Sequence, residues 1–238
     1  MASIEVSEAQ GVRYLHFGSD LVQGAMRLAR PWALELEYTR EMMLPLALRA
    51  GSGWPRSVLQ VGLGSASFTR FLHRYRPDSR VTVVEIDPAV VAAARQFFKL
   101  PDESPRLRIE IADAHDYLAG ASARFDLLLV DGCDPQGYAG MLETLPFFLN
   151  CRNRLKTGGM MAVNLLTWRG NVAAVAKRIR TAFDDHVRVL PPCGAGNTIA
   201  VASNGREIPH APDDLRAGVT RLKAETGLDL GPTLKRLG

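Results

Sequence analysis

The stretch SVLQVGLGSASFTRFL (57–72) decides the fold class of this chain of 238 residues. Its beginning, SVLQV, has the branched apolar side chains of a buried strand, and SFTRFLHRY has the apolar spacing of a helix. Between them lies a turn marked by Gly62 and Gly64. A strand, a glycine turn and a helix in this order form the nucleotide-binding unit of doubly wound α/β proteins. Ser67 occupies the position of the third glycine, so the turn departs from the dinucleotide pattern.

Strand and helix patterns alternate from this unit onward. We expect strands at 57–62, 80–87, 106–113, 125–131, 159–166, 186–191 and 197–203, and helices at 67–75, 88–98, 114–120, 140–155 and 171–183. Five strand–helix units followed by a pair of strands predict an α/β fold with a doubly wound, mostly parallel sheet of seven strands.

The segments before and after this sheet differ from it in pattern. The N-terminal segment carries short alternating apolar stretches, typical of strands or a hairpin, and then a helical pattern at 38–50 in which Pro45 predicts a kink. Near the C-terminus, Leu215, Val219 and Leu222 recur at helical spacing. We therefore expect a small N-terminal β-rich segment at 1–50, a nucleoside-binding catalytic domain at 51–205, and a helical tail packed on that domain at 206–238.

Composition narrows the class of protein. With 47% hydrophobic and 23% charged residues, the chain is typical of a globular domain and not of a disordered segment. No apolar run reaches the ~18–20 residues of a membrane span, and residues 1–10 carry no secretory pattern, so we expect a cytoplasmic protein without a membrane partner. Cys133, Cys151 and Cys193 are too scattered for a metal site or a disulfide framework, and we expect no metal cofactor.

Basic side chains gather around the first predicted helix, at Arg70, His73, Arg74, Arg76 and Arg80. The net charge is only +4, and neither interleaved aromatic residues nor a docking motif accompanies the run. We interpret it as a solvated helix face with its following loop, and we expect no nucleic-acid partner.

Carboxylates stand at the ends of the next three predicted strands, at Glu85, Asp113 and Asp131. Ligands of open parallel sheets bind beyond the carboxyl ends of the strands, so these acids should share one rim with the glycine turn. Glu85 follows Gly64 by 21 residues, close to the ~20 at which an acid meets a ribose. Its carboxylate can accept both ribose hydroxyls, and each such charged hydrogen bond is worth roughly 1.5–3 kcal/mol. Asp113, followed by Ala114, is placed to contact an adenine edge and is equally suited to cap the next helix.

The choice of nucleotide lies between a dinucleotide and an adenosyl sulfonium. A dinucleotide needs the third glycine for close helix packing and seats its pyrophosphate on the helix N-terminus. Ser67 removes that glycine, and the acids at the rim would repel a pyrophosphate. They suit a positively charged sulfonium. We therefore expect S-adenosylmethionine or its decarboxylated form as co-substrate, on a sheet of the S-adenosylmethionine-dependent methyltransferase type.

The segment FDLLLVDGCDPQGYAG (125–140) narrows the chemistry, because Asp131 and Asp134 lie three residues apart just past a buried strand. The pattern resembles the Asp-x-x-Asp-Pro motif of the spermidine synthase family of polyamine aminopropyltransferases, with Pro135 as its proline. The segments VEIDP, DAHDYL and GSDLVQGAM extend this resemblance over most of residues 12–205.

The resemblance implies transfer of an aminopropyl group from decarboxylated S-adenosylmethionine to an amine such as putrescine, with release of methylthioadenosine, by a homodimer. The nucleophile must be a free amine, and deprotonating an alkylamine of pKa ~10.4 costs roughly 4–5 kcal/mol at pH 7. We expect Asp131 to be the general base and Asp134 to hold the amine or its own loop. A turn stabilised by Asp side chains before Pro135 is the structural alternative.

The resemblance also implies contacts to the co-substrate from the positions of Gln23, Gly62, Gly64, Ser65 and Ile86, and a contact to the acceptor from Tyr38. Two positions depart from the family pattern. The acid of the family's glycine turn is Ser65 in this chain, and the tyrosine beside the family's amine cavity is Cys193. Trp168, just after the fifth strand, either lines the acceptor cavity or packs as a lid.

Two other functions stay open. One is a methyltransferase using intact S-adenosylmethionine, because Ser65 lacks the acid that would favour a purely cationic donor tail. Against it, the fourth strand is not followed by an Asn-Pro-Pro-aromatic loop. The other is a non-catalytic adenosyl-nucleoside-binding protein, which the retention of Asp131 and Asp134 disfavours.

Overall fold

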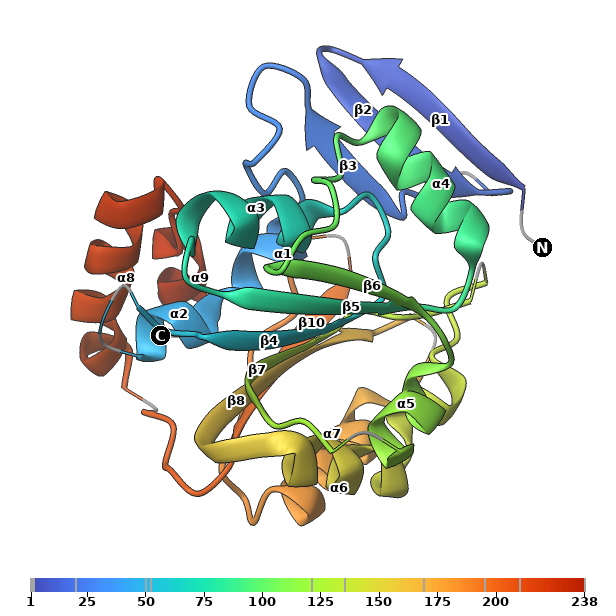
Figure 1. Cartoon of the computed structure of the whole chain (residues 1–238). Coiled ribbons are helices and arrows are strands. Elements are labelled where there is room, and N and C mark those ends of the chain that lie inside the picture. The colour runs from blue at the N-terminus through green and yellow to red at the C-terminus, as the bar shows by residue number, and fades with distance from the viewer. Residues whose placement is uncertain are drawn as a thin grey trace.

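The computed structural model describes residues 3–19, 21–49, 51, 53–120, 122–134, 136–168, 170–194, 196–209 and 211–237. Its main sheet consists of β4 (Ser57–Val61), β5 (Arg80–Glu85), β6 (Leu107–Ile111), β7 (Phe125–Val130), β8 (Leu155–Leu166), β9 (Val187–Val189) and β10 (Asn197–Ser203). The seven strands lie in the order β6-β5-β4-β7-β8-β10-β9 (Figure 1). β4 to β8 are parallel, and β10 is antiparallel to both of its neighbours. The predicted α/β class and mostly parallel seven-stranded sheet are thereby confirmed.

Helices cover both faces of this sheet, as Figure 1 shows. One face carries α1 (Glu37–Glu41), α2 (Leu44–Leu48), α3 (Ser67–Tyr75), α4 (Pro88–Phe97) and α8 (Pro212–Thr226), and the other carries α5 (Ala114–Gly120), α6 (Leu145–Arg154) and α7 (Val172–Ala182). The central strand β7 contributes Leu127 and Leu129 to the first core and Leu128 and Val130 to the second. A strand buried on both faces explains the uninterrupted apolar run in its sequence. Among the described residues, no helix has both the length and the apolar character needed to cross a bilayer.

The N-terminal segment forms a separate antiparallel sheet of β1 (Ile4–Ala9), β2 (Val12–Phe17) and β3 (Gly24–Arg27). It packs over α4, and Leu15, Met26 and Phe98 form a small core of their own between them (Figure 1). The helical pattern at 38–50 is broken into α1 and α2 rather than kinked. Pro45 is the second residue of α2, a first-turn position where the missing N–H has no helical partner to lose.

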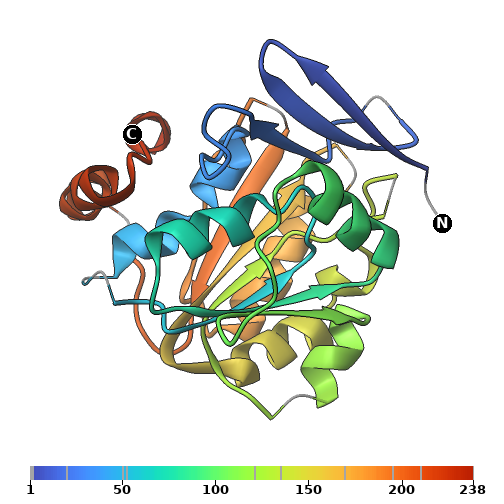
Figure 2. The ribbon, with the colours of Figure 1, turned by 45° about the horizontal axis from the view of Figure 1, so that its top comes forward.

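The C-terminal residues form α8 and a short helix, α9 (Gly231–Arg236), beside α2 (Figure 2). Leu215, Val219 and Leu222 are buried on one side of α8. A Cβ at Gly218 would lie 2.0 Å from the carbonyl oxygen of Ala47, so only glycine allows the two helices to approach this closely.

The basic run at 70–80 is only partly the solvated face expected from the sequence: Arg74 and Arg80 are exposed, but Arg70 and Arg76 are buried. The Arg70 guanidinium donates to the carbonyls of Pro31 and Phe98, both at 2.6 Å, and also to that of Ser65. Burial lowers the pKa of Arg70 to about 9. These carbonyls belong to three separate segments, and a helical spacing pattern cannot reveal such contacts.

Asp126 ties the start of β4 to β7 and gives a stability prediction. Its Oδ2 accepts from the backbone N–H of Ser57 at 2.9 Å and from Lys156 Nζ at 3.1 Å. Burial opposes the charged form, but these donors outweigh it and lower the pKa of Asp126. Its stabilising effect is therefore full above the unfolded pKa of ~3.9 and is lost as the pH falls through the lower folded pKa. We expect Asp126→Asn to lower the melting temperature at pH 7 and to lose this effect near pH 3, as thermal unfolding across that range would show.

Candidate active site

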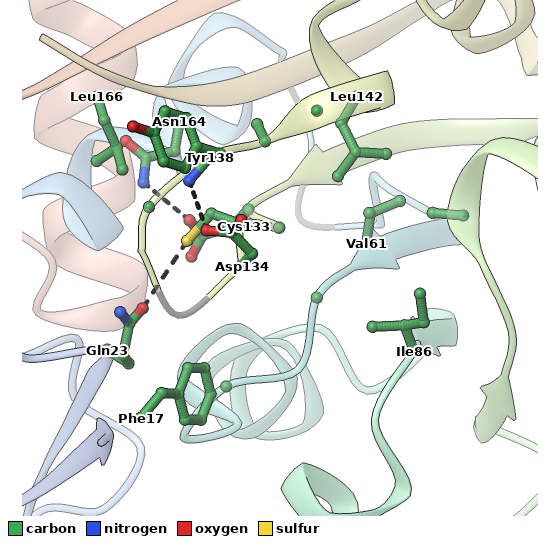
Figure 3. Close-up of a pocket in the computed structure, with 18 of the residues that line it drawn as sticks. Phe17, Gln23, Val61, Ile86, Cys133, Asp134, Tyr138, Leu142, Asn164 and Leu166 are labelled. Atoms are coloured by element: carbon green, nitrogen blue, oxygen red, sulfur yellow. Dashed lines mark hydrogen bonds between the residues drawn. The ribbon is translucent and has the colours of Figure 1, made fainter. Parts of the chain in front are cut away.

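A cavity of about 600 Å³ opens at the carboxyl ends of the parallel strands. Phe17 and Gln23 reach it from the N-terminal sheet, and Ile86 and Leu142 lie on the opposite side (Figure 3). The residues predicted for the site that line it are Gln23, Tyr38, Gly62, Gly64, Glu85, Ile86, Asp113, Ala114, Asp131, Asp134 and Trp168. Ser65 is not among the lining residues.

The glycine turn is fixed by its contacts with two strands. Gly62 has a φ of +82°, and a Cβ on it would lie 2.2 Å from the carbonyl oxygen of Asp131. Gln60 of β4 donates to the carbonyl of Gly62 at 2.8 Å and accepts from the Thr69 hydroxyl of α3, also at 2.8 Å. The turn and the Asp131 backbone are thus packed without room for a side chain between them.

The two serines of the turn face the N-terminal sheet. The hydroxyls of Ser65 and Ser67 lie 3.0 Å apart, and that of Ser67 donates to the carbonyl of Ala25 at 3.3 Å. Ser65 is buried so close to Gly24 that a Cβ there would meet its hydroxyl at 2.4 Å. Ser67, at the third glycine position, therefore links the turn to β3. Ser65, where the family has an acid, is turned away from the cavity.

Glu85 holds the turn from the next strand. Its two carboxylate oxygens accept from the backbone N–H groups of Leu63, at 2.8 Å, and Asp87, at 3.0 Å. Burial raises the pKa of Glu85, and these backbone donors act against the rise. Each carboxylate oxygen has further lone-pair capacity, which two ribose hydroxyls could use.

Asp113 caps α5 and also lines the cavity, so both roles expected for it are compatible. Its Oδ1 accepts from the backbone N–H groups of His115, at 2.7 Å, and Asp116, at 3.3 Å. In the described part of the chain, Asp113, His115 and Asp116 form a group whose ligand atoms lie close enough together to hold a metal ion. Since Asp113 bonds to the backbone here, helix capping accounts for its position. Ile86 and Ala114 stand beside it as apolar walls.

Asp131 receives two hydrogen bonds from residues far away in the sequence. Tyr38 donates its hydroxyl to Oδ2 at 3.1 Å, and the amide of Asn164 donates to Oδ1 at 2.8 Å. The carboxylate opens to the cavity but lies deep in the protein, and this burial raises its pKa, while both donors act to lower it. Burial and the charge of Asp131 raise the pKa of Tyr38 well above its ordinary value. Tyr38 is thus a neutral donor, and Asp131 is a carboxylate held in one orientation.

Asp134 organises its own loop. Its Oδ1 accepts from the backbone N–H groups of Gln136, at 2.9 Å, and Tyr138, at 2.8 Å. Pro135, the proline expected to complete the motif, lies outside the described residues. The structure therefore gives Asp134 the loop contact that was one of its two expected roles, while its position on the cavity keeps the amine contact available.

Cys133 lies between the two acids and faces Gln23 across the cavity, with 3.8 Å from Sγ to Oε1 (Figure 3). Burial and the negative charges of Asp131, Asp134 and Glu85 raise the pKa of Cys133 to about 12, so the thiol is neutral at physiological pH. Cys193, at the position of the family's tyrosine, is buried and does not line the cavity.

The outer wall of the cavity is held by the C-terminal helix. Glu37 accepts from the backbone N–H of Gly194 at 3.1 Å and from Arg236 at 2.6 Å. The same guanidinium contacts the fully buried Glu41, which also accepts from the Thr233 hydroxyl at 3.0 Å. Because Glu37 and Glu41 flank Tyr38 on α1, these contacts fix the helix that carries it.

Sequence reasoning missed four lining residues with side-chain nitrogen or oxygen atoms, Glu37, Tyr138, Asn164 and Asn197. Asn164 has a signal that could have found it, since it is the only polar side chain in the apolar stretch MMAVNLL. Asn197 opens β10 and is buried, and its amide finds the hydrogen-bond partner that a buried amide requires in Asn164. Glu37 lies in a polar helix and has no such signal.

The described residues that line the cavity give it a one-sided charge. They include five carboxylates, those of Glu37, Glu85, Asp113, Asp131 and Asp134, and no lysine, arginine or histidine. Such a cavity repels phosphates and attracts organic cations. Together with the strand order and the acid at the end of β5, it defines a transferase fold whose site suits a ligand related to S-adenosylmethionine.

Comparisons with known proteins agree with this class. The profile of the Spermine/spermidine synthase domain matches residues 36–185. A polyamine aminopropyltransferase of Neisseria meningitidis serogroup A is 34% identical over 233 residues, which cover 95% of this chain and 85% of that protein. The chain belongs to the spermine/spermidine synthase family. The expected family resemblance and the expectation of a transferase are thereby confirmed.

Solved structures support the fold. A probable spermidine synthase from Corynebacterium glutamicum superposes with a TM-score of 0.75 at 19% identity, covering 95% of this chain and 91% of its own. Human methyltransferase-like protein 13, solved in complex with S-adenosylhomocysteine (SAH), superposes with a TM-score of 0.68 at 25% identity, covering 84% and 93%. Both a probable spermidine synthase and a methyltransferase therefore share this architecture.

Proposed function

We propose that the protein transfers an aminopropyl group from decarboxylated S-adenosylmethionine to a primary amine such as putrescine and releases methylthioadenosine. The observation that carries the proposal is the charge of the cavity, with five carboxylates and no basic side chain among its described lining residues. Both proposed substrates are organic cations, and the relatives named polyamine aminopropyltransferase support the same reaction.

The charge also favours the decarboxylated donor over intact S-adenosylmethionine. The two differ by one carboxylate at the end of the aliphatic tail. That group would enter a cavity in which the charged side chains described are all acids, and like charges disfavour binding. The decarboxylated tail ends in an ammonium group instead. Gln23, Asp131 and Asp134 border the side of the cavity that we assign to this tail, and Ile86, Asp113 and Ala114 border the side assigned to adenine.

The reaction needs one proton to leave the acceptor. The amine nitrogen forms a bond to the aminopropyl carbon attached to sulfur, the carbon–sulfur bond breaks, and sulfur keeps the electron pair as the neutral thioether of methylthioadenosine. Asp131 accepts the proton from nitrogen, a general-base role typically worth ~10²–10⁴ in rate. Burial strengthens Asp131 as a base, and Tyr38 and Asn164 hold its two oxygens in place. Asp134 is assigned to the acceptor amine, and Trp168 to the acceptor wall.

A product assay tests the proposal. The purified protein would receive decarboxylated or intact S-adenosylmethionine in separate reactions, each with a panel of di- and polyamines, and mass spectrometry would identify the products. Methylthioadenosine formed together with an aminopropylated amine is the expected result. S-adenosylhomocysteine formed with a methylated acceptor would instead establish a methyltransferase. Nucleoside binding without either product would establish a non-catalytic binding protein.

Replacing Glu85 with glutamine is expected to weaken binding of methylthioadenosine by about 10–100-fold. The amide keeps the shape of the side chain but removes the charge and one of the two accepting oxygens, and with them one or two charge-assisted bonds of roughly 1.5–3 kcal/mol each. Isothermal titration with methylthioadenosine measures the change. Glu103→Gln, at an exposed position paired with Arg95, is the matched control and should bind normally. Unchanged affinity in Glu85→Gln would remove Glu85 from the ribose site.

We also propose that the protein is a homodimer located in the cytoplasm. The resemblance to the spermidine synthase family supports the dimer, and the need for a metabolic adenosyl sulfonium supports the location. Sedimentation equilibrium of the purified protein would give its oligomeric state, and fractionation of the source cells would give its location.

A further inference from the structure

We propose that Asn197 is a positioning residue for Asp131, acting through the amide of Asn164. Three side chains form a chain of hydrogen bonds that ends on the carboxylate. Asn197 Nδ2 donates to Asn164 Oδ1 at 3.0 Å, and Asn164 Nδ2 donates to Asp131 Oδ1 at 2.8 Å. The inference rests on the proposed function, because it takes Asp131 as the base of the transfer.

The sheet brings the three residues together. Val130 of β7 pairs in parallel with Val163 of β8, so the residues that follow them, Asp131 and Asn164, are neighbours at the strand ends. Asn197 pairs with Leu166 in the antiparallel ladder of β8 and β10, which places it diagonally from Asn164. Both asparagines lie on hydrogen-bonded strands, so their backbones are fixed. Only rotation of the side chain can change the direction in which each amide points.

The direction of the chain matters because an asparagine amide has one accepting end and one donating end. The donor from Asn197 engages the oxygen of Asn164, and this leaves the Asn164 amino group to face Asp131. Turned over, Asn164 would present its oxygen to a carboxylate oxygen, and that contact is favourable only when Asp131 is protonated. Asn197 thereby selects the orientation that keeps Asp131 charged and ready to accept a proton, a role like that of the outer partners of metal-binding histidines.

The titratable groups that face Asp131 in the unmodified protein come from several elements packed around it. They are Tyr38 of α1, Cys133 and Asp134 of its own loop and, around the cavity, Glu37 of α1, Glu85 of β5 and Asp113 at the start of α5, with Cys193 near Tyr38. Asn164 and Asn197 do not titrate. Asn197→Asp adds one carboxylate to this set, and its charge must be separated from the orientation of the Asn164 amide by a control in which Asn164 is absent.

The test is the pH dependence of kcat/KM for Asn197→Asp. An acid at this position accepts instead of donating, so the amino group of Asn164 turns toward it and the oxygen of Asn164 turns toward Asp131. We expect the acid limb of the profile to move to higher pH by about one to two units, the shift produced by losing one charge-assisted hydrogen bond. The variant should lose ~10–100-fold at pH 6 and recover most of its activity at high pH.

Two further variants test whether the shift comes from the orientation of the Asn164 amide, from the new charge at position 197, or from damage to β10. In an Asn164→Ala background, Asn197→Asp should add little further shift, because the residue that relays the effect is gone. Thr198→Val changes the next residue of β10, which points to the opposite face and whose buried hydroxyl has no partner among the described residues. Its pH profile should match that of the unmodified protein.

The outcomes distinguish this inference from the proposed function. An acid-limb shift that requires Asn164 supports the positioning role. A loss in Asn197→Asp that is equal at every pH, or a shift of the same size without Asn164, overturns it while leaving aminopropyl transfer intact. Failure of the unmodified protein to form aminopropylated product would instead overturn the proposed function on which the inference rests.

Discussion

Asp131→Asn is expected to lower kcat for aminopropyl transfer by ~10²–10⁴ while changing the affinity for methylthioadenosine less than about threefold. Asparagine has the same shape: its oxygen can accept from Asn164, and its amino group can donate to the Tyr38 hydroxyl, so both neighbours keep their places. What is lost is a carboxylate able to take a proton from an alkylammonium group of pKa ~10.4, which is almost fully protonated at pH 7. Rapid-quench turnover and isothermal titration would measure the two quantities separately.

The pH dependence of the residual activity of Asp131→Asn gives a second test. Without a base, the reaction depends on the fraction of amine that is already deprotonated, so its rate should rise about tenfold per pH unit between pH 7 and 9. Asp78→Asn, which changes the same charge at an exposed position near Arg56, serves as the control and should keep full activity. If kcat falls less than tenfold, Asp131 is not the base. The same holds if the affinity for the donor falls in parallel with kcat.

Gly62→Ala is expected to lower the free energy of unfolding by ~2–5 kcal/mol and to abolish donor binding. The left-handed backbone costs an alanine ~1–2 kcal/mol, and forcing its Cβ against a packed neighbour adds ~1–3 kcal/mol. That neighbour is the carbonyl oxygen of Asp131, 2.2 Å from the Cβ position, so the strain falls directly on the proposed base. Chemical denaturation and titration with methylthioadenosine would measure both effects.

Gly11 provides the matched control for Gly62. It also has a positive φ, +73°, but lies in the turn between β1 and β2 with no atom within 4 Å of its Cβ position. Gly11→Ala should therefore show only the backbone cost of ~1–2 kcal/mol and bind the donor normally. If Gly62→Ala and Gly11→Ala destabilise the protein equally, the glycine turn relaxes away from Asp131. The close packing of Gly62 against Asp131 then does not constrain the site.

Most of the sheet could be predicted from the sequence because its strands are buried on both faces. The run FDLLLV became β7, and SFTRFLHRY became α3 with the expected bounds. Parallel strands bring their carboxyl ends to one edge, so Glu85, Asp113 and Asp131 reach one cavity as periodicity and strand direction predict. These features depend on local pattern and on one rule of topology.

The contacts that orient the site could not be predicted in this way, because they join distant segments. Tyr38 and Asp131 are 93 residues apart, and Asn164 and Asp131 are 33 apart. Ser65 packs against Gly24 and Ser67 donates to Ala25, both in β3, and Arg70 is buried against the carbonyl of Pro31. Strand spacing carries no information about such contacts. β1 lies in the segment expected to be β-rich, but its bounds could not be predicted, since its side chains are mostly exposed.

The pairing of Glu41 with Arg236 sets the order in which the site can be completed during synthesis. The two residues are 195 positions apart, and a ribosome adding ~5–20 residues per second needs about 10–40 s to cover that interval. Until α9 emerges, a buried carboxylate on α1 has no cation to neutralise it, and burying it unpaired is costly. The helix that carries Tyr38 therefore locks only after all strands of the main sheet have been made. A nascent chain can form the glycine turn and the Glu85 contact early, but it finishes the acceptor side of the cavity last.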